Sequence, residues 1–216
     1  MNLAFGGGIR SRRAFVRALG WVGAFALLAL SNDALAQVLS SNALVAALRK
    51  GGYVVVIRHA SSPATLPTRQ TADLGNVKLE RQLDAAGREG AIALGRGLRE
   101  LKIPVGEVFC SPAFRATETA RLAELLKPKF QEELGEAAPG ALSISEVQAN
   151  WLKDEVKKLP KADNTIIVTH NPNLTKAFPD WGGAVAHGEA VVLGLDSKGA
   201  TRIVGRIKVD EWLRLR

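Results

Sequence analysis

The sequence predicts an α/β fold: a three-layer α/β/α sandwich with a mostly parallel central sheet. Three short apolar runs indicate buried strands, over residues 53–58, 105–110 and 165–169. Segments with apolar residues at helical spacing separate these runs. Because strands that alternate with helices favour parallel pairing, we expect helices to cover both faces of one sheet.

The first two helices are predicted from their ends. Residues 42–50 form a short amphipathic helix, and the pair Gly51-Gly52 stops it. Asp84 is suited to cap a second helix, which runs to about Lys102. Its apolar stripe consists of Leu83, Ala91, Leu94, Leu98 and Leu101.

Two more helices follow the second strand. Ser111 is the expected N-cap and Pro112 the first residue of a helix that extends to about Leu126. A short strand is expected near Phe130. Residues 145–158 then form a helix, whose expected inward side chains are Val147, Trp151 and Val156.

The remaining elements are a short helix, a terminal hairpin and a long loop. The helix covers residues 171–178. Residues 190–195 and 201–209 are expected to pair around the turn at 196–199. Residues 61–82 form an irregular segment, and a loop of that length in a compact domain is usually functional.

The first 36 residues have the three parts of a secretory signal peptide. A basic segment with Arg12 and Arg13 precedes an apolar stretch over 18–30, and Ala-Leu-Ala at 34–36 is a cleavage site. The arginine pair favours the twin-arginine route; an ordinary secretory signal and an uncleaved anchor are the alternatives. We therefore expect residues 37–216 to form one periplasmic domain with no stable membrane span.

The composition excludes several classes of protein. The formal net charge is +8, and the signal segment contributes four arginines and one aspartate to it, so the remainder carries +5. No dense basic run with interleaved aromatic residues follows, so nucleic-acid binding is not expected. The single cysteine, Cys110, cannot form an internal disulfide, and we expect a buried, inert thiol. No Cys/His cluster has metal-ligand spacing, so no metal and no cofactor are expected.

Two of the three histidines share one context. His59 ends the first predicted strand, directly after Arg58, and His170 ends the strand over 165–169. Ligands of open α/β folds bind at the carboxyl ends of the strands. Arg115 lies one turn into the helix after the second strand, whose N-terminus points at the same edge. We therefore expect Arg58, His59, Arg115 and His170 to converge.

Such a cluster predicts an anionic ligand, because like charges at close range repel by several kcal/mol. Imidazole can attack phosphorus, and guanidinium groups hold phosphoryl oxygens in pairs. Each residue alone also fits a structural histidine or a solvated arginine. The repetition of a cationic group at three strand-to-helix junctions indicates phosphate chemistry.

Four short motifs occur in order. They are Arg-His-Ala at 58–60, Leu-Asp-x-x-Gly-Arg at 83–88, Ser-Pro-x-x-Arg-x-x-x-Thr-Ala at 111–120, and Thr-His-Asn at 169–171. Together they resemble the signatures of the histidine phosphatase superfamily, the group that includes phosphoglycerate mutases. The resemblance spans residues 54–209 and implies a phosphoglycerate mutase-like fold. The segments 188–192 and 210–212 are similar to a small exported bacterial branch of this group.

The resemblance implies a role for each residue. His59 is the expected nucleophile, which forms a phosphohistidine, and Arg58, Arg115 and His170 bind the phosphoryl group. Water then hydrolyses the intermediate without a metal. The implied activity is the hydrolysis of small phosphate monoesters, and a mutase is less expected in an exported protein. The alternative is a non-catalytic phosphate-binding or envelope-interaction protein on the same fold.

The general acid is where the sequence departs from the family pattern. Some members carry Asp directly after the second histidine, but Asn171 stands there in this chain. Glu189 is the first choice for the acid, with a role in orienting His or Arg groups as its alternative. Asp73 and Glu80 are next, and His187 is expected behind the substrate-binding groups or in solvent. Other members carry a glutamate in the region of Glu132, Glu133 and Glu136.

Overall fold

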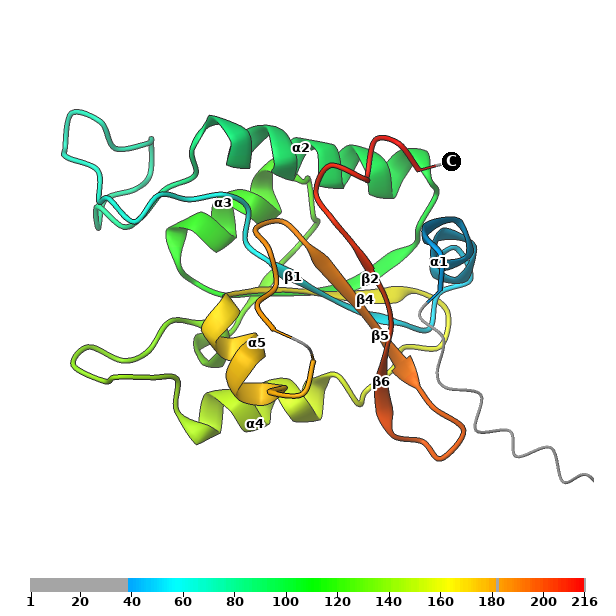
Figure 1. Ribbon diagram of the computed structural model, residues 1–216. Coiled ribbons are helices and arrows are strands. Elements are labelled where there is room, and N and C mark those ends of the chain that lie inside the picture. Colours follow the sequence, from blue (N-terminus) through cyan, green and yellow to red (C-terminus); the bar gives the residue numbers. More distant parts are fainter. Residues whose placement is uncertain (1–38, 182, 216) are drawn as a thin grey trace, which may run out of the picture. The chain divides into compact units, whose positions relative to one another are not determined.

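A sheet of six strands forms the centre of the computed structural model, which describes residues 39–181 and 183–215 (Figure 1). The predicted signal peptide, residues 1–36, lies outside the described residues. The strands are β1 (Val54–Arg58), β2 (Val105–Cys110), β3 (Lys129–Phe130), β4 (Asn164–Thr169), β5 (Ala190–Leu195) and β6 (Thr201–Ile207). Their order is β3-β2-β4-β1-β5-β6. The first four are parallel, whereas β5 and β6 run antiparallel to their neighbours, which confirms the mostly parallel sheet.

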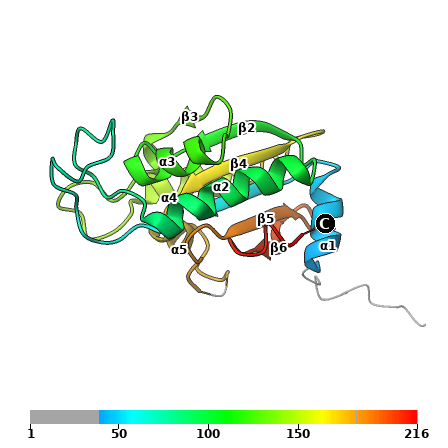
Figure 2. The same ribbon diagram turned by 90° about the horizontal axis from the view of Figure 1, so that it is seen from above.

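Helices cover both faces of the sheet, as predicted (Figures 1 and 2). The described helices are α1 (Ser41–Leu48), α2 (Ala85–Glu100), α3 (Phe114–Leu122), α4 (Glu146–Glu155), α5 (Asn171–Ala177) and the 3-10 turn η1 (Glu132–Leu134). The first three pack on one face and α4 and α5 on the other. No helix within the described ranges is long and apolar enough to cross a membrane.

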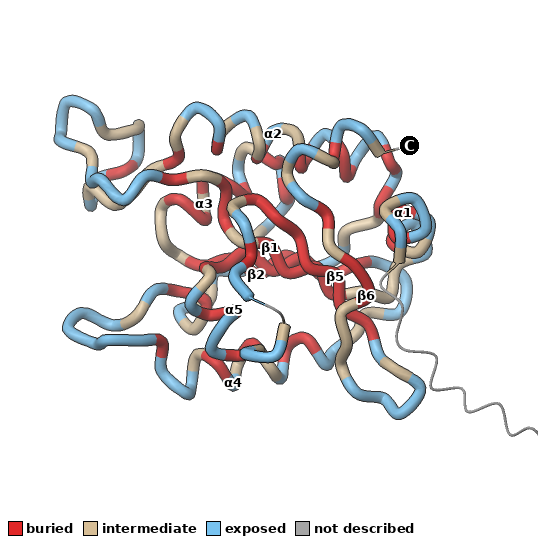
Figure 3. Tube along the Cα trace, in the orientation of Figure 1, coloured by how far each residue is buried: buried red, intermediate tan, exposed pale blue. Residues whose placement is uncertain are grey.

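Successive residues of β1 face opposite layers. Val55 and Ile57 pack with the helices of the first face, and Val54 and Val56 pack with α4 and α5. All four are at most 1% exposed, so the apolar run is buried on both sides, as Figure 3 shows for the sheet. Cys110, at the end of β2, is also buried, and burial raises the pKa of its thiol to about 12.

Helix α2 starts where the sequence predicts. Asp84 is its N-cap, and the Oδ1 atom accepts a hydrogen bond from the Gly87 N–H at 2.7 Å. The helix ends at Glu100, slightly before the predicted Lys102. The whole predicted apolar stripe is buried: Leu83, Ala91, Leu94, Leu98 and Leu101.

Helix α3 begins later than predicted, and Ser111 is not its N-cap. Ala113 occupies that position, and the Ser111 hydroxyl instead contacts His170 at 2.8 Å. The Glu80 carboxylate, from the long loop, accepts a hydrogen bond from the Phe114 N–H at 2.7 Å. A side chain distant in sequence therefore replaces the local cap. The helix ends at Leu122 rather than near residue 126.

The predicted inward face of α4 is partly wrong. Val156 is fully buried and Trp151 is half-buried, but Val147 is 70% exposed. Val147 lies in the first turn, which a Ser145 capping box holds at the edge of the layer. Ala149 and Leu152 form the inner face instead, and both are fully buried.

The carboxyl ends of three neighbouring strands meet at one edge. Parallel pairing with β4 continues one residue beyond β1 and β2: the His59 N–H donates to the Thr169 carbonyl, and the Ser111 N–H donates to the Val168 carbonyl, both at 2.9 Å. The irregular segments 61–82 and 135–145 project from the same end (Figures 1 and 2). The fold therefore places His59, His170 and two long loops at the same end of the sheet.

Candidate active site

His59 has a defined tautomer. Its Nδ1 atom lies 2.8 Å from the Ala60 carbonyl, which can only accept, so Nδ1 carries the proton. Its Nε2 atom accepts a hydrogen bond from Arg115 Nε at 3.1 Å. The ring is 3% exposed, and burial, followed by the Arg115 charge, lowers the pKa of His59 to about 3. At neutral pH the imidazole is therefore uncharged, with a lone pair on Nε2.

Arg115 joins the two site histidines. It lies in the first turn of α3 and is 2% exposed. Its Nη2 atom donates to His170 Nδ1 at 2.8 Å. The same guanidinium pairs with Glu136, at 2.5 Å from Nη2 to Oε1 and 3.2 Å from Nη1 to Oε2. One buried cation thus contacts two imidazoles and a half-exposed carboxylate.

His170 is also neutral. Because Nδ1 accepts from Arg115, the ring proton lies on Nε2, which donates to the Ser111 hydroxyl at 2.8 Å. Burial, then the Arg115 charge, holds the pKa of His170 well below its ordinary value. The His59 and His170 ring centroids are 5.1 Å apart. The two rings therefore face one shared space with Arg115 between them.

Arg58 lies at the end of β1, and its charge acts on both site histidines. Its Nη1 atom donates to the Val185 carbonyl at 2.7 Å, and Nη2 lies 2.6 Å from His187 Nε2. Its buried Nε has no hydrogen-bond partner in the described part of the chain. Burial, then the charges of Arg81 and Arg115, lowers the pKa of Arg58. The structure brings Arg58, His59, Arg115 and His170 together as predicted, but both histidines are neutral, so the arginines alone carry the charge.

Thr119 explains the spacing of the third sequence motif. One turn after Arg115, its hydroxyl donates to the Arg115 carbonyl at 2.7 Å. The same oxygen accepts from the Ala60 N–H at 3.0 Å. The threonine therefore ties the residue after the His59 position to the helix that carries Arg115, which fixes the two groups relative to each other.

The geometry does not favour Glu189 as the general acid. Its Oε2 atom accepts from the Ala186 N–H at 2.7 Å, and its Oε1 atom pairs with Arg206 at 3.3 Å. Its backbone carbonyl accepts from the Arg58 N–H at 3.2 Å. A buried carboxylate with these contacts shapes the segment beside Arg58, which is the alternative role considered above.

The other candidate carboxylates are divided between the site and its surroundings. Asp73 forms two contacts with Arg88, at 2.6 and 2.5 Å, and so braces the long loop. Glu80 caps α3, and Glu136 contacts Arg115. Of the three glutamates in the region after α3, only Glu136 has a described contact with the site cations.

Asn171 stands where some superfamily members carry an acid. Its Oδ1 atom accepts from the Val185 N–H at 2.9 Å. The asparagine thus anchors the segment that also receives Arg58, so its role in this structure is to position backbone rather than to supply a proton.

Sequence reasoning missed Arg81. Its Nε and Nη2 atoms donate to the Pro63 and Ser62 carbonyls, both at 2.7 Å. Its charge contributes to the lowered pKa values of Arg58, His170 and His187. It is therefore a third guanidinium beside the site. The sequence did offer a signal for Arg81: it lies three residues before Asp84, the predicted N-cap of the helix that starts at the same edge of the sheet.

These residues define an α/β protein with three guanidinium groups and two neutral histidines gathered at the carboxyl edge of its sheet. The sequence profile of the histidine phosphatase superfamily (branch 1) matches residues 54–171, which is more than half of the chain. The chain belongs to this superfamily. A search of curated proteins found no significant match.

Solved structures share the fold at low sequence identity. The protein histidine phosphatase SixA complexed with tungstate has a TM-score of 0.53 and 14% identity, covering 74% of this chain and 98% of its own. An Escherichia coli protein provisionally assigned as an alpha-ribazole-5'-P phosphatase has a TM-score of 0.54 and 16% identity. The match covers 73% of this chain and 97% of that protein. Phosphoserine phosphatase from Entamoeba histolytica, in complex with 3-phosphoglyceric acid, has a TM-score of 0.51 and 11% identity. The match covers 72% of this chain and 96% of that protein. These similarities establish the fold.

The tautomer and charge of His59 lead to a direct prediction. Between pH 8 and 4.5 its ring should stay neutral with the proton on Nδ1, because its pKa is about 3. The unfolded chain takes up this proton near pH 6.5, so this histidine's contribution to stability declines as the pH falls below 6.5. Imidazole ¹⁵N chemical shifts measure both the titration midpoint of the ring and the nitrogen that carries its proton. A titration midpoint near 6.5, or a proton on Nε2, would contradict the assignment.

Proposed function

We propose that this protein is an exported phosphatase that hydrolyses small phosphate monoesters through a phosphohistidine at His59. The observation that carries the proposal is the unprotonated Nε2 atom of His59, buried against the guanidinium of Arg115. A lone pair on nitrogen is what attack on phosphorus requires. Membership of the histidine phosphatase superfamily supports the same class of reaction.

The cations fit the charge that develops during phosphoryl transfer. Arg115 contacts both site histidines, Arg58 contributes a second positive charge beside them, and Arg81 adds a third guanidinium nearby. Planar guanidinium groups bind phosphoryl oxygens in pairs and stabilise the equatorial charge of the transition state. A bound phosphoryl group would take the place of the Glu136 carboxylate on Arg115. His170 Nδ1, the nitrogen released by Arg115, would then take up a proton and donate it in a hydrogen bond to a phosphoryl oxygen.

The alternative is a protein on this fold that binds phosphate without catalysis. Such a protein gains affinity from protonated imidazoles, which donate hydrogen bonds and carry a positive charge. Here the Ala60 carbonyl and Arg115 hold His59 in the opposite state, with the lone pair directed at the cation cluster. The state of the ring therefore favours catalysis over binding alone.

Substitution of His59 tests the reaction. His59→Asn should lower kcat for p-nitrophenyl phosphate by at least about 10³-fold, because the attacking atom is lost while the size of the side chain is nearly kept. Lys198→Ala, in the exposed turn between β5 and β6, is the control and should retain wild-type activity. Circular dichroism establishes that both variants fold.

The two functions give different results in this experiment. Substantial hydrolysis by His59→Asn would contradict a phosphohistidine at this position. Phosphate binding by a wild-type protein that hydrolyses no ester would support the binding protein instead.

We also propose that the chain reaches the periplasm through its N-terminal segment. The support is the sequence order of Arg12-Arg13, an apolar stretch and Ala34-Leu35-Ala36. Export places the site among extracytoplasmic phosphate esters and favours hydrolysis over the phosphoryl exchange of a mutase. The irregular segments 61–82 and 131–145 flank the site and are the proposed determinants of specificity.

Expression in a bacterium with a twin-arginine system tests the export proposal. The periplasmic protein should begin at Gln37, as measured by mass spectrometry of its N-terminus. Replacement of Arg12 and Arg13 by lysine should leave the protein in the cytoplasm. Unchanged export of that variant would point to the general secretory route, and an uncleaved protein in the membrane fraction would contradict the proposal.

A further inference from the structure

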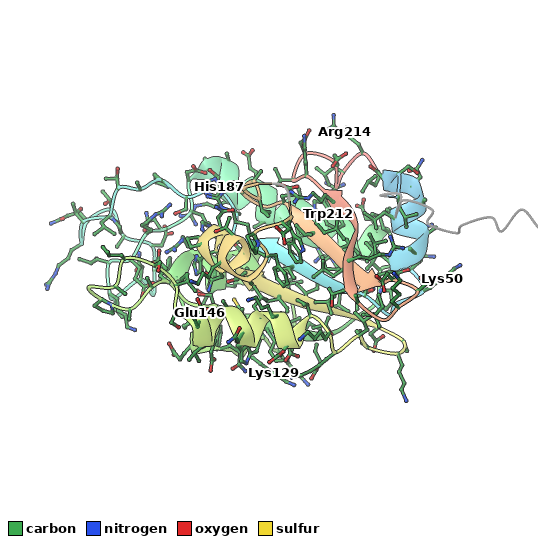
Figure 4. All side chains as sticks on the ribbon, turned by 60° about the horizontal axis from the view of Figure 1, so that its bottom comes forward. Lys50, Lys129, Glu146, His187, Trp212 and Arg214 are labelled. Carbon is green, nitrogen blue, oxygen red and sulfur yellow. The ribbon has the colours of Figure 1, made fainter. Side chains whose placement is uncertain are left out.

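His187 lies beside the proposed nucleophile but has no part in the reaction described above. Its ring centroid is 5.3 Å from that of His59, and its Nε2 atom is 2.6 Å from Arg58 Nη2. The side chain is half-buried, on the connection that enters β5 (Figure 4). It therefore contacts both the proposed phosphoryl site and solvent, as a group that exchanges protons during turnover must.

The carboxylates around the site already accept hydrogen bonds. Glu189 accepts from a backbone N–H and pairs with Arg206, Glu136 pairs with Arg115, and Glu80 accepts from the first N–H of α3. Asp84 accepts from Gly87 and from a serine hydroxyl. Each of these carboxylates is therefore already engaged by a donor and is not directed at a leaving group.

We propose that His187 is the proton donor to the leaving group and, in the second step, the proton acceptor from water. This proposal rests on the function proposed above and completes it. Its basis is the position of His187 beside His59 and Arg58, together with the engagement of the neighbouring carboxylates.

Substrate binding would switch the protonation state of His187. In the free protein Arg58 can only donate, so the Nε2 atom of His187 is unprotonated. Burial, then Arg58, Arg81 and Arg115, lowers the pKa of His187, and Asp84 opposes this effect. A phosphoryl dianion draws Arg58 away from Nε2 and neutralises the surrounding cations. Both changes favour uptake of a proton at Nε2.

The protons and electron pairs of both steps balance. His59 Nε2 forms a bond to phosphorus as the bond from phosphorus to the ester oxygen breaks. The ester oxygen keeps the electron pair and takes the Nε2 proton of His187, which gives the alcohol. Water then attacks phosphorus and transfers a proton to the neutral His187. The bond from phosphorus to His59 breaks, and phosphate leaves. Only the ester and water are consumed.

The dependence of rate on the leaving group tests this role. The purified mature protein and its His187→Asn variant are assayed on p-nitrophenyl phosphate and on an alkyl phosphate, with kcat/KM as the measure of the first step. General acids contribute about 10²–10⁴-fold. We expect kcat/KM of the variant to fall by about 10²–10⁴-fold on the alkyl ester. On p-nitrophenyl phosphate, whose leaving group needs no proton, kcat/KM should fall by less than about tenfold.

Matched variants separate His187 from the carboxylates. We expect kcat/KM for the two substrates to change by the same factor in each of the variants Glu189→Gln, Glu136→Gln and Glu80→Gln. An equal effect of His187→Asn on both substrates, or a leaving-group-dependent loss in one of the glutamine variants, would overturn the proposal. A wild-type protein that is inactive on every ester would instead remove the proposed function itself.

A second measurement does not depend on the folding of a variant. The ¹⁵N titration of His187 in the wild-type protein is recorded with and without saturating inorganic phosphate. The midpoint should rise by at least one pH unit when phosphate is bound, because the anion neutralises the cations that face the ring. An unchanged midpoint would contradict substrate-coupled protonation.

Discussion

The buried guanidinium of Arg115 determines the chemical state of the site. A charge that is 2% exposed must be compensated by hydrogen bonds and an opposite charge, and His59, His170 and Glu136 provide them. A guanidinium only donates, so each histidine presents a lone pair to it and stays neutral. Burial of the His59 ring, together with this cation, thus leaves a nucleophilic nitrogen at neutral pH, and the paired carboxylate occupies the place proposed for a ligand anion.

The fold brings the partners of the Arg115 guanidinium to one place. Parallel pairing of β1, β4 and β2 brings three chain segments to one edge in register, so His59, His170 and Ser111 follow their strands side by side. Thr119 then ties the Arg115 helix to the backbone beyond His59. Three of the four sequence motifs meet at this guanidinium: one carries Arg115 itself, and the motifs at 58–60 and 169–171 carry its partners His59 and His170.

The strands, the layers and the convergence of cations follow from local sequence, because burial on both faces and strand-to-helix junctions leave local patterns. Features that depend on distant partners do not. Glu80 caps a helix that begins 34 residues later, so Ser111 is free to contact His170. Glu189 is next to β5 in sequence, but its carboxylate pairs with Arg206 on the neighbouring antiparallel strand. The partner that such a side chain meets depends on how the strands pair, which the local sequence does not encode.

The position of the phosphoryl group on the trapped enzyme tests the central claim most directly. Rapid quenching in base after mixing with a phosphate ester, followed by ³¹P NMR and peptide mass spectrometry, distinguishes the two nitrogens of a phosphohistidine. The account predicts one phosphohistidine, at His59 and bonded through Nε2, because Nδ1 is committed to the Ala60 carbonyl. A phosphoryl group on Nδ1 of His59, or on His170 or His187, would contradict it.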